Sequence, residues 1–226
     1  MPTAQSTAKA RRPDKIKTRL AHTKVTRQDW LMAARDTLVS EGVGEVKILV
    51  LSAQLNVARS SFYWYFDSRA DLLAALLSVW EARNTRCIID KCAQPANNIT
   101  QALCHFFECF VDGVLFDQGL DFAVREWSRR DPQVRTKIDA ADTARISAVI
   151  RMFERHGYSE RDSDGRARIL YFMQLGYHAL EVKESMETRM SRLEPYVRGF
   201  SGQDVDITAL EDFKSRAFAL ANEQSK

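Results

Sequence analysis

The chain has 226 residues, of which 45% are hydrophobic and 28% charged, and its net charge is +3. This is the composition of a folded globular protein, and it excludes a disordered chain because a core of this size can offset the chain entropy. It also excludes a collagen-like or low-complexity chain, because Gly numbers only nine and Pro only five. So few turn-forming residues favour long helices, and no apolar run of about 18 residues predicts a membrane span.

The charge is unevenly distributed along the chain. Residues 1–25 carry seven basic side chains and one acidic one, residues 26–70 carry five of each, and residues 71–226 carry 21 basic and 24 acidic side chains. A basic arm beside an acidic body indicates a polyanion such as nucleic acid as partner. A solvated tail or a mitochondrial targeting segment has a similar composition, whereas a secretory signal would need an apolar run.

The first predicted helix begins after Thr26, which forms a capping box with Asp29, and it ends at Gly42. An apolar segment follows at 47–55, where four consecutive aliphatic residues leave helix and strand both open. A short helix is then expected at 58–65. Ser68 and Asp71 form a second capping box, and they begin a long helix that reaches about residue 92.

The remaining 130 or so residues are predicted to be helical as well, by the same periodicity and capping signals. Asp131 and Pro132 are typical of a helix start, and Gly157 of a helix end. Pro195 is expected to interrupt one short helix. The expected ranges are 98–115, 119–130, 133–156, 163–188, 192–200 and 206–222.

The order of helix, glycine turn, short helix, tight turn and short helix is that of a helix-turn-helix DNA-binding motif. Asn56 suits the tight turn because it tolerates a positive φ angle. Arg can bond guanine edges, Ser can bond bases or phosphates, and aromatic side chains can pack on thymine methyl groups. The candidates on the second short helix are Arg59, Ser60, Ser61, Tyr63 and Trp64. Phe62 and Phe66, four residues apart, are expected in the core.

Residues 51–66, LSAQLNVARSSFYWYF, resemble the DNA-binding signature of the TetR (tetracycline-repressor) family, and DSRADLL at 67–73 resembles the start of that family's fourth helix. The resemblance covers residues 26–77. It implies that the five candidates on the second short helix face the major groove, and that Ser61, Tyr65 and Arg69 are alternatively placed to touch phosphates. It also implies that the basic arm, with Arg11 and Arg12, follows phosphates or enters the minor groove.

This chain departs from the family signature at several positions. Trp64 stands where a His is common, and Asn56 and Ser60 stand where Gly is common. Aliphatic Leu49 and Val50 replace polar residues of the first motif helix. Lys47 and Ser52 therefore remain as its polar candidates for DNA contact.

The C-terminal region is rich in aromatic residues, which fill a helical core or line a pocket between helices. The resemblance implies a small-molecule cavity among the middle helices, and no residue identifies its ligand. The candidate effector contacts are His105, Phe106, Phe110, Arg125, Trp127, Tyr171 and His178.

Two pairs spaced three residues apart, His105 with Glu108 and His178 with Glu181, suggest an alternative function. Each pair shares a helix face, as in helical bundles that bind two metal ions. The order is reversed relative to the usual Glu-x-x-His, and further Glu donors are not obvious. A metal-dependent helical enzyme is thus the alternative, and the main interpretation needs no cofactor.

The four cysteines, Cys87, Cys92, Cys104 and Cys109, form no Cys-x-x-Cys motif. Neighbouring pairs are five residues apart, which places their side chains about 140° apart on a helix and excludes a disulfide within one helix. We expect free, buried thiols in a reducing cytoplasm.

An apolar stripe on the last helix and a wide apolar arc on the helix from 163 indicate a surface for a second copy of the chain. The resemblance implies a dimer interface of four helices, two from each chain, which would place two recognition helices on a pseudo-palindromic site. Packing within one chain would give the same stripes. The candidate interface residues are Leu175, Leu210, Phe213, Ala217 and Leu220.

These observations predict an all-α protein in which a three-helix helix-turn-helix domain is joined by a long helix to a helical ligand-binding and dimerisation domain. The expected division is an arm at 1–25, a DNA-binding domain at 26–70 and an effector-binding and dimerisation domain at 71–226. The predicted function is that of a cytoplasmic transcriptional regulator, most simply a repressor that binds a double-stranded operator as a homodimer and is released by a small molecule. No membrane partner is expected.

Overall fold

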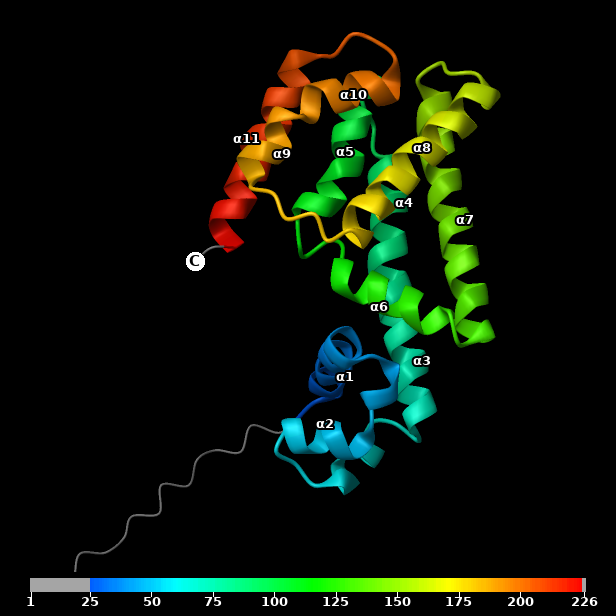
Figure 1. Cartoon of the computed structure of the whole chain (residues 1–226), viewed down its shortest axis with the longest axis vertical. Helices are drawn as coiled ribbons and strands as arrows, with labels where there is room; N and C mark the ends of the chain where they lie inside the picture. The colour runs from blue at the N-terminus through cyan, green and yellow to red at the C-terminus, as the bar shows by residue number, and fades with distance from the viewer. Residues whose placement is uncertain (1–24, 225–226) are drawn as a thin grey trace, which may run out of the picture.

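The computed structural model of the chain describes residues 25–224, with side chains described for residues 25–221. Helices make up all the regular structure of this region (Figure 1), as the sequence predicts. Their bounds are α1 (Arg27–Glu41), η1 (Val43–Glu45), α2 (Ile48–Gln54), η2 (Arg59–Trp64), α3 (Arg69–Trp80), η3 (Glu81–Thr85), α4 (Arg86–Ala93), α5 (Ile99–Val111), α6 (Gln118–Ser128), α7 (Pro132–Arg155), α8 (Glu160–Ala179), α9 (Met186–Ser191), α10 (Leu193–Ser201) and α11 (Ile207–Gln224). None of these helices is long and apolar enough to cross a membrane.

Local side-chain hydrogen bonds explain where most helices begin. The capping box of Thr26 and Asp29 is present at the start of α1, and Gly42 ends that helix with a φ angle of 84°. Ser68 and Asp131 cap α3 and α7 as the sequence predicts. Each of these side chains accepts a hydrogen bond from a backbone N–H that the helix leaves unpaired.

A small head and a larger body are joined by one helical run (Figure 1). The head contains α1, α2 and η2, and the run α3–η3–α4 leads from it into the body. The predicted helix at 68–92 is therefore present, but η3 inside it is a π-helical turn. This turn brings the polar side chains of Asn84 and Thr85 into the interior.

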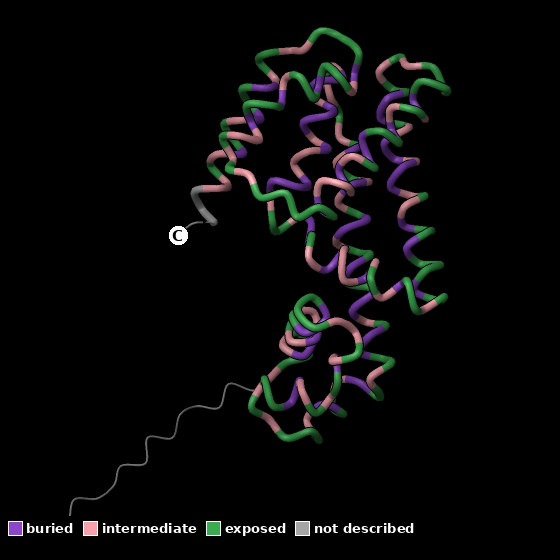
Figure 2. The backbone as a smooth tube through the Cα atoms, in the orientation of Figure 1, coloured by how far each residue is buried: buried purple, intermediate pink, exposed green. Residues whose placement is uncertain are grey.

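The buried positions line the inward sides of the helices and form two clusters (Figure 2). One fills the body between α4, α5, α7, α8 and α11. The other contains the head's Trp30, Phe62 and Phe66 together with residues of α6 and the first turns of α7. The head thus shares its core with α6, and the predicted boundary at residue 70 is not a boundary in the packing.

The structure resolves one expectation that the sequence left open and differs from two others. The segment 48–51, open between helix and strand, is helical in α2. The helix expected at 163–188 ends at Ala179, and Glu181 then adopts a left-handed φ angle of 47°, so that a loop and the short α9 follow. Pro195 does not interrupt α10, because it lies in the first turn, where no backbone N–H is needed.

Candidate nucleic-acid interface

Aromatic packing fixes the second element of the helix-turn-helix motif, η2. The ring centroid of Phe62 lies 5.2 Å from the ring centroid of Trp30 and 5.4 Å from that of Phe66. All three side chains are buried. The predicted core positions of Phe62 and Phe66 are therefore confirmed. Asn56 makes the preceding tight turn with a φ angle of 53°, as predicted.

The opposite side of η2 faces solvent. Arg59 and Ser60 are exposed, and Tyr63 and Trp64 remain 55% and 73% exposed. The two neighbouring rings together form an exposed apolar surface that a partner can contact. Because Phe62 is held in the core, the backbone of η2 presents these side chains from a fixed position.

Other predicted DNA contacts are occupied inside the head. Arg69 donates hydrogen bonds from Nε to the Val46 carbonyl at 2.6 Å and from Nη2 to the Val43 carbonyl at 2.5 Å, which ties α3 to the loop before α2. The hydroxyl of Tyr65 donates to the Val25 carbonyl at 2.7 Å. Both side chains thus hold the head together. A direct contact with DNA would have to use the part of each side chain that is not engaged in these hydrogen bonds.

The two predicted serines also bond to nearby carbonyls. Ser52 is buried and donates to the Leu49 carbonyl at 3.0 Å, so this candidate does not face solvent. Ser61 is half-buried and donates to the Ala58 carbonyl at 2.8 Å. Lys47 is exposed and pairs with Glu45 at 2.9 Å, while Arg11 and Arg12 lie outside the described residues.

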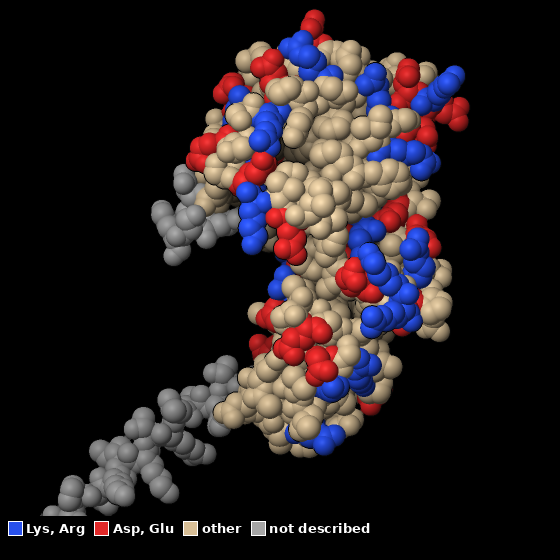
Figure 3. All heavy atoms as spheres, viewed as in Figure 1, with Lys and Arg blue, Asp and Glu red and all other residues tan. Residues whose placement is uncertain are grey.

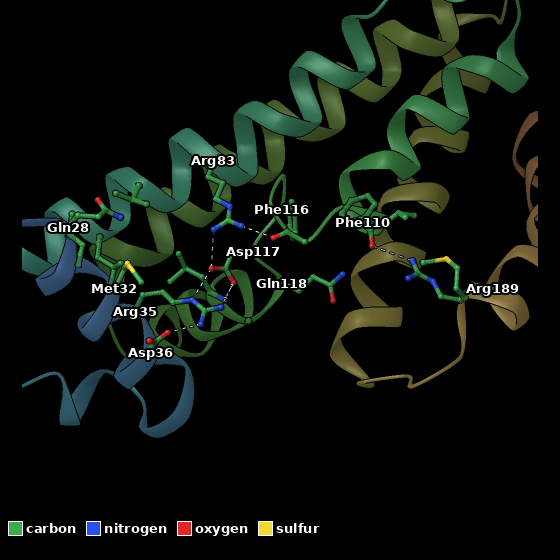
Figure 4. A pocket seen from close by; sticks show the side chains of 18 residues that line it. Gln28, Met32, Arg35, Asp36, Arg83, Phe110, Phe116, Asp117, Gln118 and Arg189 are labelled. Atoms are coloured by element: carbon green, nitrogen blue, oxygen red, sulfur yellow. Dashed lines mark hydrogen bonds and ion pairs between the residues drawn. The ribbon is translucent and has the colours of Figure 1, made fainter. Parts of the chain in front are cut away.

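Head and body meet at a group of polar residues that we call the seam: Arg35, Arg83, Asn84 and Asp117. Figure 4 shows Arg35 and Arg83 pointing toward Asp117. Arg35 of α1 donates two hydrogen bonds to the Asp117 carboxylate, at 2.7 and 2.9 Å. Asn84 of η3 bonds the backbone N–H and carbonyl of Asp117 at 3.0 and 2.9 Å. Burial acts to raise the pKa of Asp117. The hydrogen bonds from Arg35 and from the Leu120 N–H, together with the charges of Arg35 and Arg83, outweigh burial and lower that pKa.

A second polar group lies deeper and is called here the Asp121 network. The Asp121 carboxylate accepts from Trp80 at 2.8 Å, Arg145 at 2.9 Å and Arg125 at 3.0 Å. Burial acts to raise the pKa of Asp121, but the two arginines outweigh it and lower that pKa to about 2. The network is completed by Asp142, which pairs with Arg125, and Tyr171, whose hydroxyl bonds Asp142 at 2.7 Å.

The expected effector contacts are therefore distributed over several environments. Arg125 and Tyr171 belong to the Asp121 network, and Phe106 and Phe110 lie in the body core. Trp127 donates to Asp131 at 3.2 Å, and His105 is half-buried on α5. His178 is buried against Phe110, with ring centroids 5.3 Å apart. Of these seven residues, Trp127 and His178 line one groove, and Phe110 lines another.

One groove of 830 Å³ lies between the end of α1, α6 and the end of α8, and Trp127 and His178 are among its lining residues. Other cavities lie beside the seam and within the body. A groove of 720 Å³ runs between α1 and the body and is lined by Met32, Arg35, Val79, Phe110, Asp117 and Arg189, among others (Figure 4). A smaller cavity of 50 Å³ lies within the body between α5, α8, α9 and α10, and it shares Val111 and Arg189 with the groove.

The predicted dimer residues of the last helix need correction. Leu210, Phe213 and Ala217 are buried within the chain, where α11 packs on α5, and Leu220 packs against the same core. A side chain that is already buried cannot be covered again by a partner. Leu175 of α8 is half-buried and also packs on this core.

The alternative metal site receives no support. Among the described side chains, no group of three His, Cys, Asp or Glu could hold a metal ion. Glu108 pairs with Lys91 at 2.6 Å and with Arg216 at 2.9 Å instead. His178 is buried among aromatic rings, while Glu181 is exposed in the loop after α8.

Comparison with known proteins adds the family. The family model described as bacterial regulatory proteins of the tetR family matches residues 31–76. None of the curated protein sequences matches the chain. Among solved structures, a TetR-family transcriptional regulator from Marinobacter aquaeolei VT8 is similar with a TM-score of 0.60 at 14% identity, covering 87% of this chain and 99% of that one.

Two further structures have the same fold. GusR from Salmonella enterica has a TM-score of 0.53 at 15% identity, covering 92% of this chain and 98% of that one. A TetR-like transcriptional regulator from Rhodococcus sp. RHA1 has a TM-score of 0.51 at 16% identity, covering 86% and 95%. At these identities the likeness establishes the shared fold.

The head, the exposed η2 and the helical body define a helix-turn-helix DNA-binding protein. Residues 31–76 match the model of the TetR family of bacterial regulatory proteins, and the whole chain has the fold of solved TetR-family regulators. This is a family of regulators rather than enzymes. The seam residues Arg35 and Asp117 were missed from the sequence, since nothing local relates two positions 82 residues apart.

Proposed function

We propose that the protein is a homodimeric repressor that binds a pseudo-palindromic double-stranded operator and is released from it by a small molecule. The observation that carries this proposal is the exposed side of η2, with Arg59, Ser60, Tyr63 and Trp64 presented by a rigid aromatic core. A DNA-binding regulator acts where the DNA is, so we place the protein in the cytoplasm.

Sequence recognition would rest on a few groups in the major groove. Arg59 is suited to guanine O6 and N7, while Tyr63 and Trp64 offer apolar contact to thymine methyl groups and sugars. Residues 26–70 carry equal numbers of acidic and basic side chains, so bulk charge does not give this domain its affinity. The basic arm, residues 1–25, would supply the phosphate contacts that depend on salt.

The dimer interface is proposed on α8. Its outward side carries Ile169 and Phe172, which are 64% and 52% exposed, beside Gly165 and Gly176. Leu180, which directly follows the last turn of α8, is 78% exposed. These positions repeat at helical spacing and form one apolar stripe, with the glycines permitting close approach of a partner helix. Figure 3 shows a band without charged side chains across the body. Two α8 helices packed together would place two heads on one duplex.

The proposed effector site is the groove beside the seam. Its volume lies within the range of small-molecule sites, and it combines apolar Met32, Val79 and Phe110 with the cationic Arg189. An occupant would lie against both α1 and the body. It would therefore favour one spacing of the heads over another, which is the differential binding that allosteric release requires.

The test of this function is a selection from random double-stranded DNA with the purified full chain. We expect enrichment of two inverted half-sites separated by about one helical turn between centres. Tyr63→Ala should abolish the enrichment. Arg198→Ala, at an exposed arginine on α10 at the far end of the body, is the matched control and should leave it intact. Enrichment of no motif by the wild-type chain would contradict the proposal.

A further inference from the structure

Two of the four cysteines lie against each other in the body. Cys87 on α4 and Cys109 on α5 are 22 positions apart in sequence, and their Sγ atoms are 2.9 Å apart. Both are free thiols. A disulfide has an S–S length of about 2.05 Å, so a movement of about 1 Å would bring the two sulfur atoms to bonding distance.

The two thiols differ in access and acidity. Cys87 is half-buried and therefore reachable by a small solute, whereas Cys109 is buried. The hydrogen bond with Cys109 lowers the pKa of Cys87, and the charge of Lys91 one turn along α4 acts in the same direction against the effect of burial. Burial raises the pKa of Cys109. Since the thiolate is the reactive form, Cys87 is the attacking sulfur and Cys109 the resolving one.

The other two cysteines differ from this pair in burial and in thiol pKa. Cys92 and Cys104 are buried, and burial raises the pKa of each thiol to about 12. The Cys104 thiol contacts the carbonyl of Ala209 at 3.9 Å. These thiols stay protonated at neutral pH and should react slowly.

Charged groups beside the pair hold its helices in place. Lys91 of α4 pairs with Glu108 of α5 at 2.6 Å, and Glu108 also pairs with Arg216 of α11 at 2.9 Å. Glu108 directly precedes Cys109 in the chain. The ion pairs therefore maintain the alignment of α4 and α5 at the level of the two sulfur atoms.

We propose that Cys87 and Cys109 are a site of reversible disulfide formation by peroxides. The Cys87 thiolate attacks one peroxide oxygen, the O–O bond breaks, and a sulfenic acid forms with release of one water from hydrogen peroxide. The Cys109 sulfur then attacks the sulfenic sulfur, and the hydroxyl leaves as a second water. The two thiols lose two protons and two electrons in total, and the peroxide accepts them to give two waters.

The bond would connect elements that lead to the head. α4 continues α3 through η3, and α3 begins at Arg69, one short turn after η2 ends at Trp64. A disulfide would fix the body end of this helical run to α5. Because it closes a loop in the unfolded chain, it should also raise the melting temperature of the oxidised protein.

The test uses the full chain, reduced, freed of reductant and exposed to hydrogen peroxide. We expect loss of two of the four thiols per chain within a monomeric band on a non-reducing gel, and full recovery with dithiothreitol. After alkylation, trypsin releases Cys87 in the peptide 87–91, and a Glu-specific protease cuts after Glu108 to separate Cys109 from Cys104. The expected product joins peptide 87–91 to the peptide that begins at Cys109.

Several results would overturn the site. These are four intact thiols after peroxide, a linkage that contains Cys92 or Cys104, or linkage only between chains. Cys87→Ala should lose no thiol to a disulfide, whereas Cys104→Ala, the matched control, should still lose two. Mapping of the wild-type chain decides the question even if one of these variants fails to fold.

Discussion

The imidazole of His178 is buried beside Phe110 and Phe116, with Gln174 as its hydrogen-bond partner at 2.8 Å. Burial lowers the pKa of His178 to about 4, and the nearby charges of Asp121 and Arg189 act in opposite directions on it. The folded state therefore keeps this side chain neutral at a pH at which the unfolded chain binds a proton. The histidine cannot serve as a cation in the body at neutral pH.

His178 should make the protein less stable as the pH falls from about 6.5 to about 4. Well above pH 6.5, His178 is neutral in both the folded and the unfolded protein and does not affect stability. On going from pH 7 to pH 5, its contribution should lower the free energy of unfolding by about 2 kcal/mol. His178→Gln should remove that part of the decline, as measured by urea unfolding at both pH values. His105 and His156, which also have lowered pKa values, remain in both proteins as an internal control. An equal decline in wild type and variant would refute this assignment.

The carboxylate of Asp121 balances the charge of the buried Arg145 guanidinium. Asp121→Asn should lower the free energy of unfolding by about 3–5 kcal/mol, since it leaves a buried charge without its partner. Asp139→Asn breaks the exposed pair with Arg135 and should cost less than about 1 kcal/mol. Chemical unfolding at neutral pH compares the two; similar losses would show that the network is not needed.

At the scale of elements, the helix starts were predictable because their signals are local. Thr26 lies three residues from Asp29, and Ser68 three residues from Asp71, so the caps could be seen in the sequence. The end of α8 was not predictable, because the left-handed turn is made by Glu181 and not by a glycine, which would have marked it in the sequence. Periodicity also revealed the apolar stripe of Leu210, Phe213 and Ala217, but not that α5 covers it.

Contacts between distant elements were the part beyond sequence reasoning. Arg35 and Asp117 join α1 to the start of α6, and Tyr171 and Arg125 proved to be partners of Asp142 rather than free pocket groups. Arg69 resembles a phosphate contact by its position in the motif, yet its guanidinium bonds two backbone carbonyls of the head. Composition and spacing show which residue types are present, but they do not show which distant residue each side chain bonds to in the fold.

The seam predicts a measurable coupling between α1 and α6. In a double-mutant cycle of Arg35→Gln and Asp117→Asn, the interaction free energy should be about 1–3 kcal/mol in favour of the wild-type pair. Asn retains the ability to cap α6, so the cycle isolates the charged contact. Unfolding free energies of the four proteins give the value, and additivity within error would mean that the seam does not couple head and body.

For the whole molecule, the proposed interface on α8 determines whether two heads act together. Phe172→Glu places a charge in the middle of the exposed stripe and should convert a dimer into a monomer in analytical ultracentrifugation. Lys137→Glu, at an exposed position on α7, is the matched control and should leave the mass unchanged. A dimer that survives Phe172→Glu would place the interface elsewhere.

The arrangement of the molecule is that of a small, nearly neutral head held by a shared core and a charged seam to a helical body. Loss of one head in a dimer, or of one key side chain in each head, should then weaken operator binding far more than any change of surface charge on the body. A good bidentate contact to a base contributes about 1–3 kcal/mol. With one such contact in each head, the effect doubles.

The most direct test of this account is the affinity of Arg59→Ala for the operator obtained by selection, measured by fluorescence anisotropy at fixed salt. The account predicts a loss of at least about 30-fold relative to the wild-type chain, from two lost base contacts, and an unchanged affinity for Arg198→Ala. Equal affinities of Arg59→Ala and the wild type for that operator would contradict the claim that η2 reads DNA.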